Sequence, residues 1–149
     1  FDEIAARYAD PSAGERLFVS RRGWNPEGSG ARVMLNEAEI AEALEAEGFE
    51  TILPHEMSMA DQIRRFASAR IVVGAAGSAM FNTVFCRPGT IVVDIESEPH
   101  WIAAHMNLFG SRGLAYGVFE GETMNRDWDT PHKPFWVDAK ALVARVRSL

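Results

Sequence analysis

The sequence predicts an α/β fold: a doubly wound, mostly parallel five-stranded sheet with helices on both faces. Apolar, β-branched runs alternate with amphipathic segments along the chain, which is typical of βαβ units. The apolar run at residues 70–73 stops at a Gly-rich turn, and residues 90–95 are so continuously apolar that they indicate a buried central strand. A chain of 149 residues is long enough for one such domain.

The first half of the chain begins with a helical pattern at residues 2–8 and a first strand at residues 16–20. Residues 23–30 are polar, rich in glycine and form a loop. Asn36 and Glu39 have the spacing of a capping box before a helix that ends at Gly48, and residues 50–53 form the second strand. Ser58 and Asp61 repeat this spacing before the next helix. The inward stripe of that helix is expected to consist of Met59, Ile63, Phe66 and Ala67.

The second half continues the alternation from the third strand, which begins at Arg70. A helix is expected at residues 78–86, a fourth strand at residues 90–95 and a fifth at residues 114–119. Pro99 opens the helix between the last two strands. Residues 120–134 have no periodicity and are expected to form an irregular surface loop, after which Asp138 caps a terminal helix.

One helical crossover separates each strand from the next, so the right-handed solution is the strand order 2-1-3-4-5 of a Rossmann-like sheet. In this order the first and third strands are neighbours, and the helices after them lie on opposite faces. The arrangement opens a crevice at the carboxyl ends of the strands, where doubly wound folds bind their ligands.

The Gly-rich turn after the third strand borders this crevice. A turn between a strand and a helix gathers backbone N–H groups at the positive end of the helix dipole, which favours a phosphate. The residues of the turn expected to bind a diphosphate are Gly74, Ala75, Ala76, Gly77 and Ser78. Two structural roles compete with binding, since the glycines permit close packing of strand and helix and Ser78 is suited to cap the helix.

Arg21 and Arg22 follow the first strand directly and are planar cations suited to bidentate phosphate contacts. Neighbours on a strand point to opposite sides, so both are not expected in the crevice, and a solvated strand end is the other role open to each. Arg32 follows the polar loop and either folds over the bound anion or lies on the surface.

Three further side chains are candidates for contacts with a nucleoside or sugar. Asn82 lies one helical turn after Ser78, where its amide is expected to bind a sugar or base or else to cap the edge of the core. Asp94 ends the fourth strand and is suited to accept from ribose hydroxyls. His55 follows the second strand and is a candidate for acid-base chemistry. The histidines are dispersed, so no metal site is predicted.

Composition excludes several classes of partner. The formal charge of −6 argues against a general nucleic-acid surface, and no apolar run has the length of a transmembrane segment. The single cysteine, Cys86, excludes an internal disulfide and is expected to be a small buried side chain rather than a catalytic thiol. We expect a cytoplasmic protein. The chain opens at Phe1 within a helical pattern, so a preceding domain is also expected.

The sequence resembles the catalytic domain of glycosyltransferase family 61, which includes bacterial capsular-polysaccharide biosynthesis proteins. The resemblance spans about residues 16–119 and rests on ordered blocks at residues 17–22, 35–39, 48–50, 72–82 and 85–90. It implies the C-terminal, nucleotide-sugar-binding half of a two-domain, GT-B-like transferase whose N-terminal domain supplies much of the acceptor site.

Individual residues that border the predicted crevice also match positions of the family. Arg21 matches the family's strand-end arginine, which would meet the diphosphate. The Gly-rich turn and the helix after it are matched at Gly74, Gly77, Ser78 and Asn82. Asp94 falls where the family usually has a glutamate. Members commonly have histidine where this chain has Ala76, which can neither donate to a phosphate nor shuttle a proton.

These observations predict a metal-independent glycosyltransferase that needs no cofactor and moves a sugar from a nucleoside-diphosphate sugar to a saccharide acceptor in polysaccharide biosynthesis. Arg21 and the turn amides would neutralise charge on the leaving diphosphate. No residue is identified as the catalytic base, and inversion, which the resemblance suggests, stays open against retention. Ala76 favours a rival prediction, a non-catalytic nucleotide or sugar-phosphate binding module. A flavodoxin-like signalling domain is disfavoured because no acidic cluster follows the first strand.

Overall fold

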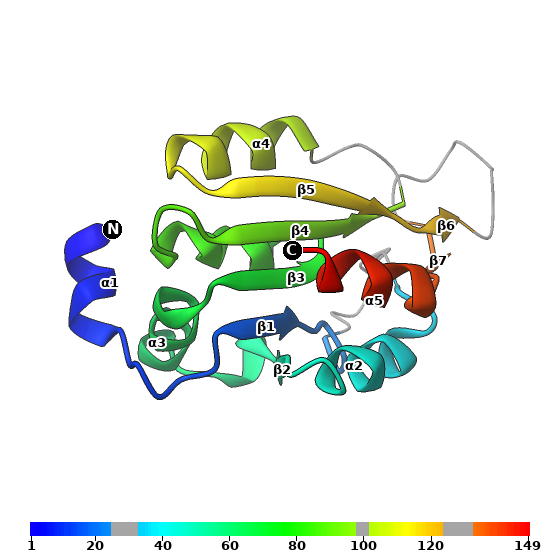
Figure 1. Ribbon diagram of the computed structural model, residues 1–149, viewed down its shortest axis with the longest axis horizontal. Coiled ribbons are helices and arrows are strands. Elements are labelled where there is room, and N and C mark those ends of the chain that lie inside the picture. The colour runs from blue at the N-terminus through cyan, green and yellow to red at the C-terminus, as the bar shows by residue number, and fades with distance from the viewer. Residues whose placement is uncertain (25–32, 98–101, 124–132) are drawn as a thin grey trace.

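A computed structural model of the chain describes residues 1–24, 33–97, 102–123 and 133–149 (Figure 1). Its elements, in chain order, are α1 (Asp2–Tyr8), β1 (Arg16–Val19), α2 (Glu37–Glu45), β2 (Glu50–Ile52), the 3₁₀ turn η1 (Pro54–Glu56), α3 (Met59–Ser68), β3 (Ile71–Ala75), the 3₁₀ helix η2 (Ser78–Phe85), β4 (Ile91–Glu96), α4 (Ile102–Ser111), β5 (Ala115–Glu120), β6 (Glu122–Thr123), β7 (Phe135–Trp136) and α5 (Ala139–Arg147).

The main sheet has five parallel strands in the order β2-β1-β3-β4-β5, which confirms the predicted fold class and strand order. β3 is buried along its whole length, as expected of a central parallel strand. The strands all run in one direction, so their carboxyl ends share one edge of the sheet (Figure 1). β1 and β3 are direct neighbours there, with Val19 paired to Gly74.

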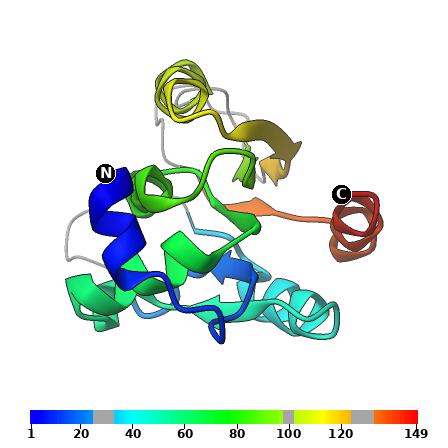
Figure 2. The same ribbon diagram turned by 60° about the vertical axis from the view of Figure 1, so that its left-hand side comes forward.

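Helices cover both faces of the sheet (Figure 2). Each face has its own apolar core. On one face α2 and α5 pack through Ile40, Leu44, Leu142 and Val146. On the other face α3, η2 and α4 pack through Phe66, Met80 and Phe109. The helix after β1, which is α2, and the helix after β3, which is η2, therefore lie on opposite faces of the sheet. This confirms the doubly wound arrangement.

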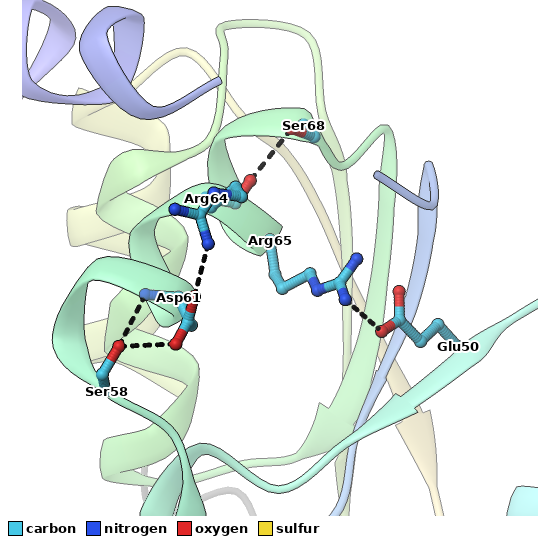
Figure 3. A network of polar contacts seen from close by, with 6 residues as sticks. All are labelled: Glu50, Ser58, Asp61, Arg64, Arg65 and Ser68. Atoms are coloured by element: carbon cyan, nitrogen blue, oxygen red, sulfur yellow. Dashed lines mark hydrogen bonds and ion pairs between the residues drawn. The ribbon is translucent and has the colours of Figure 1, made fainter. Parts of the chain in front are cut away.

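The polar contacts of α3 agree with the predicted capping pattern (Figure 3). The Asp61 N–H donates to Ser58 Oγ at 3.1 Å, and the Ser58 hydroxyl donates to the Asp61 carboxylate at 2.6 Å. At the far side of the helix, Arg65 forms an ion pair with Glu50 of β2 at 3.2 Å. The predicted stripe is correct for Ile63, Phe66 and Ala67, which are buried, and wrong for Met59, which is 60% exposed at the first helical position.

Three other local predictions are corrected. Residues 78–85 form a 3₁₀ helix rather than an α-helix, and its N-cap residue is Gly77, so Ser78 is the first helical residue and not the cap. Asn36 occupies the N-cap position of α2 but makes no capping hydrogen bond, since its side chain is bonded to Val137 and Glu39. Residues 122–123 of the predicted loop at residues 120–134 form β6, which pairs antiparallel with β7 just after the loop.

Several sequence predictions lie outside the described residues. They concern Arg32, the helix start at Pro99, and most of the loops at residues 23–30 and 120–134. Within the segments that the structure describes, no helix combines the length and the apolar character needed to span a bilayer.

Candidate functional site

The centre of the candidate site is the point where β1 and β3 end side by side. Gly74 of β3 lies so close to its neighbours that a Cβ atom there would be 2.7 Å from Met80 Sδ and 2.9 Å from Val19 Cβ. The absence of a side chain at Gly74 therefore lets η2 and β1 approach β3. This contact supports the close-packing role that the sequence left open for this glycine.

The turn after β3 has two parts with different hydrogen bonding. The Ala76 N–H donates to the carbonyl of Ile95 in β4 at 3.0 Å. Gly77 has φ 153° and ψ −171°, a conformation that only glycine adopts readily. The Met80 N–H donates to the Gly77 carbonyl at 3.0 Å and begins the helical pattern. The N–H groups of Ser78 and Ala79 precede this bond and have no acceptor within the helix. Donors at this position of a helix are suited to bind an anion.

A carboxylate that the sequence analysis missed organises the end of β1. The buried Ser20 hydroxyl donates to Glu37 Oε1 at 2.8 Å, and the Arg21 N–H donates to the same oxygen at 2.6 Å. The Arg22 N–H donates to Ser20 Oγ at 3.2 Å. Glu37 thus fixes the backbone from which both arginines project. Because it already accepts the Arg21 N–H, Arg21 can contact an anion only through its guanidinium group.

The two arginines differ in burial. Arg21 is partly buried and Arg22 is exposed. Both residues lie beyond β1, which ends at Val19, so the alternation expected along a strand does not apply to them. Of the candidate arginines that the structure describes, Arg21 is the less exposed.

His55 lies in η1, close to the segment that leaves β1. Its ring centroid is 5.8 Å from that of Trp24, and its Nε2 atom is 3.7 Å from Glu56 Oε1. A Cβ atom added at Gly23 would be 3.7 Å from His55 Nε2. The structure therefore brings His55 next to the residues after Arg22, on the side of β1 where β2 lies.

Asn82 is turned toward α3. Its Nδ2 atom donates to Gln62 Oε1 at 2.9 Å, and Gln62 Nε2 donates to the carbonyls of Pro54 at 2.8 Å and Met57 at 3.2 Å. Gln62, which the sequence analysis also missed, therefore ties η2 to the turn that carries His55. This contact corresponds to the edge-of-core role that the sequence left open for Asn82.

Asp94 lies beneath the surface, at the centre of a buried polar cluster. Its Oδ2 atom is 2.5 Å from Nδ1 of His105 in α4 and accepts a hydrogen bond from the Tyr116 hydroxyl of β5 at 2.8 Å. Asp94 and His105 are both 0% exposed. Burial, followed by the negative charge of Asp94, raises the pKa of Tyr116. Asp94 does not reach a ligand directly in this arrangement.

Metal and thiol chemistry find no support in the described segments. No group of three or more His, Cys, Asp or Glu residues in them is arranged to hold a metal ion. Cys86 is 1% exposed, and burial raises the pKa of its thiol to about 12. A thiol in this state is not a nucleophile at neutral pH, in agreement with the buried role predicted for it.

The structure is a Rossmann-like α/β fold in which β1 and β3 end side by side at one edge of the sheet. A family model described as Glycosyltransferase 61 matches residues 3–93, which extend from α1 into β4 and include both strand ends and the Gly-rich turn. The chain belongs to glycosyltransferase family 61, as its resemblance predicted, and so has a glycosyltransferase function in the general sense. No curated protein sequence matches it.

Proposed function

We propose that this chain is the donor-binding domain of a glycosyltransferase that moves a sugar from a nucleoside-diphosphate sugar to a saccharide acceptor. The proposal includes a polysaccharide product of the capsular kind, a cytoplasmic location and a preceding N-terminal domain that carries much of the acceptor site. It also includes a mechanism that needs neither a metal ion nor a cofactor.

The observation that carries the proposal is the pairing of β1 with β3. Val19 lies opposite Gly74, so the backbone of Arg21 is beside the turn that leads into η2. The Arg21 guanidinium group and the N–H groups of Ser78 and Ala79, which have no acceptor within η2, would then meet the diphosphate. Such donors stabilise the charge that develops as the sugar–phosphate bond breaks, since they are held in place before the reaction.

The other predicted residues have different parts in this proposal. Arg22 and Arg32 would add charge near the outer phosphate, and His55 would contact the nucleoside or sugar from the β2 side. Asn82 and Asp94 would act through the residues that they hold, because Asn82 is bonded to Gln62 and Asp94 is buried.

Ala76 favours a second candidate, a binding module without catalytic activity. Its methyl group is buried, and its N–H group donates a hydrogen bond to the Ile95 carbonyl. A side chain that could move a proton is therefore lacking at this point of the turn. In the glycosyltransferase reading, the base that activates the acceptor hydroxyl comes from the preceding domain.

Isothermal titration calorimetry with UDP, GDP and CMP tests the site that both candidates share. We expect at least one nucleotide to bind, and Arg21→Gln to weaken it about tenfold or more because a charge-assisted contact is lost. Arg70→Gln is the matched control, since Arg70 is an exposed arginine at the opposite end of β3, paired with Glu15. If no nucleotide binds at millimolar concentration, the proposed site is wrong.

The two candidates are separated by an activity measurement on the chain together with its expected preceding domain. Transfer of a labelled sugar from the donor, or hydrolysis of the donor, identifies an enzyme. Nucleotide binding without either reaction identifies a binding module.

A further inference from the structure

We propose that Phe81 is the aromatic platform on which the nucleobase of the donor stacks. This inference rests on the proposed function and adds to it a residue that reads the base. It follows from the helix type of η2, from the buried cluster around Asp94 and from the exposure of the Phe81 ring.

The 3₁₀ geometry of η2 decides which side chain lies over the start of the helix. A 3₁₀ helix has three residues per turn, so residues three apart lie on the same face. The burial pattern follows this period, because Met80 and Thr83 are both 0% exposed. Ser78 therefore shares its face with Phe81, and Asn82 shares its face with Ala79, to whose carbonyl Asn82 Nδ2 also donates at 3.3 Å. In an α-helix, Asn82 would have been above Ser78 instead.

The ring of Phe81 packs against His105, which belongs to the buried polar cluster around Asp94. It meets the His105 ring edge to face, with centroids 5.0 Å apart and an angle of 72° between planes. His105 is held by Asp94, and its other side packs on Phe109 with centroids 5.0 Å apart. A platform fixed in this way loses little conformational freedom when a ligand stacks on it. Asp94 and His105 are accordingly positioning residues for Phe81.

Phe81 nevertheless remains 37% exposed, on the same helical face as the first residue after the Gly-rich turn. A diphosphate at this turn has its nucleoside and its sugar on either side. The base offers a planar face to an aromatic side chain, whereas the sugar offers the C–H groups of a puckered ring. We assign the base to Phe81 because every nucleobase has a planar π face that can stack on an aromatic ring, whichever polar groups are at its edge. The exposed Trp24, beside His55, then borders the other end of the donor.

Calorimetry with a nucleoside diphosphate and with inorganic pyrophosphate separates the base from the phosphates. We expect Phe81→Leu to weaken UDP or GDP about five- to tenfold and to leave pyrophosphate unchanged, because only the nucleotides have a base to stack. Arg21→Gln should weaken both ligands. Phe85→Leu is the matched control: it removes a second phenylalanine from η2 on a different face, where Phe85 packs against Phe1, and should leave both affinities unchanged.

Three results would overturn the inference while leaving the proposed function intact. The first is equal nucleotide affinity in Phe81→Leu and the unaltered chain. The second is a loss seen with a nucleotide sugar but not with its nucleoside diphosphate, which would assign the sugar to Phe81. The third is a loss of base-dependent affinity in Trp24→Leu instead. Failure of the unaltered chain to bind any nucleotide would instead count against the proposed function.

Discussion

At the scale of single residues, Gly74 is needed for packing whatever the ligand. A methyl group there would lie 2.9 Å from Val19 Cβ and 3.0 Å from the Val19 carbonyl oxygen, neither of which can turn aside. We expect Gly74→Ala to lower the free energy of unfolding by about 1–3 kcal/mol, the usual cost of overpacking a core. Urea denaturation followed by circular dichroism measures this change.

The control is a glycine with room for a methyl group. Gly110 lies in α4, and a Cβ atom added to it has nothing within 4 Å. Alanine has the higher helix propensity, so Gly110→Ala should raise the free energy of unfolding by about 0.5–1 kcal/mol. Equal effects of the two substitutions would show that the close approach at Gly74 is not maintained in solution.

At the scale of elements, Asn36 connects the start of α2 to the segment before α5. Its Nδ2 atom donates to the Val137 carbonyl at 2.8 Å, and its Oδ1 atom accepts the Val137 N–H at 3.1 Å. Val137 is fully buried, so Asn36→Ala leaves both of its backbone groups without these partners. We expect a loss of about 1–3 kcal/mol, and faster amide hydrogen exchange in α5.

Ser58→Ala provides the comparison, because Ser58 caps α3 and touches neither α2 nor α5 through a hydrogen bond that the structure describes. Loss of the cap should cost about 1 kcal/mol and speed exchange at the start of α3. If Asn36→Ala left exchange in α5 unchanged, Asn36 would not connect the two elements.

The strands and their order could be predicted because each signal was local or followed from chirality. Residues 71–75 and 91–96 are buried β-branched runs, and right-handed crossovers leave few arrangements of such strands. The 3₁₀ form of η2 could not be predicted. Apolar residues occur on most positions of residues 78–86, so a period of 3.0 and a period of 3.6 fit the sequence equally well.

The position of some candidate residues at the sheet edge was predictable in the same way. Arg21 and the Gly-rich turn follow apolar strands directly, so their place at the sheet edge follows from the strand order. Glu37 and Gln62 were missed because their partners, Ser20 and Asn82, are 17 and 20 residues away in the chain. The local sequence around a polar helical residue does not indicate that its side chain bonds to a residue so far away in the chain. His105 was missed for a similar reason, since its partner Asp94 lies on another element.

At the scale of the whole molecule, buried groups that hold their protons should make the fold sensitive to alkali. The Cys86 thiol has its pKa raised by burial from 9.0 to about 12. The folded chain therefore keeps this proton between about pH 9 and pH 12, whereas the unfolded chain releases it. The free energy of unfolding is unaffected below this range and falls as the pH rises through it. Tyr116, whose pKa is also raised by burial and by Asp94, acts in the same direction above pH 10.

Cys86→Ala isolates the contribution of the thiol, because the other ionisable groups are common to both proteins. The variant should be less stable at pH 8, since it loses a buried side chain. Between pH 8 and pH 10 the unaltered chain should lose about 1 kcal/mol more than the variant, given that one pKa unit corresponds to about 1.4 kcal/mol. Urea titrations of both proteins at the two pH values measure this difference directly. A gap in stability that stays constant would mean that the thiol is hydrated in the folded chain, and that the core between η2, α3 and α4 is looser than the burial of Cys86 indicates.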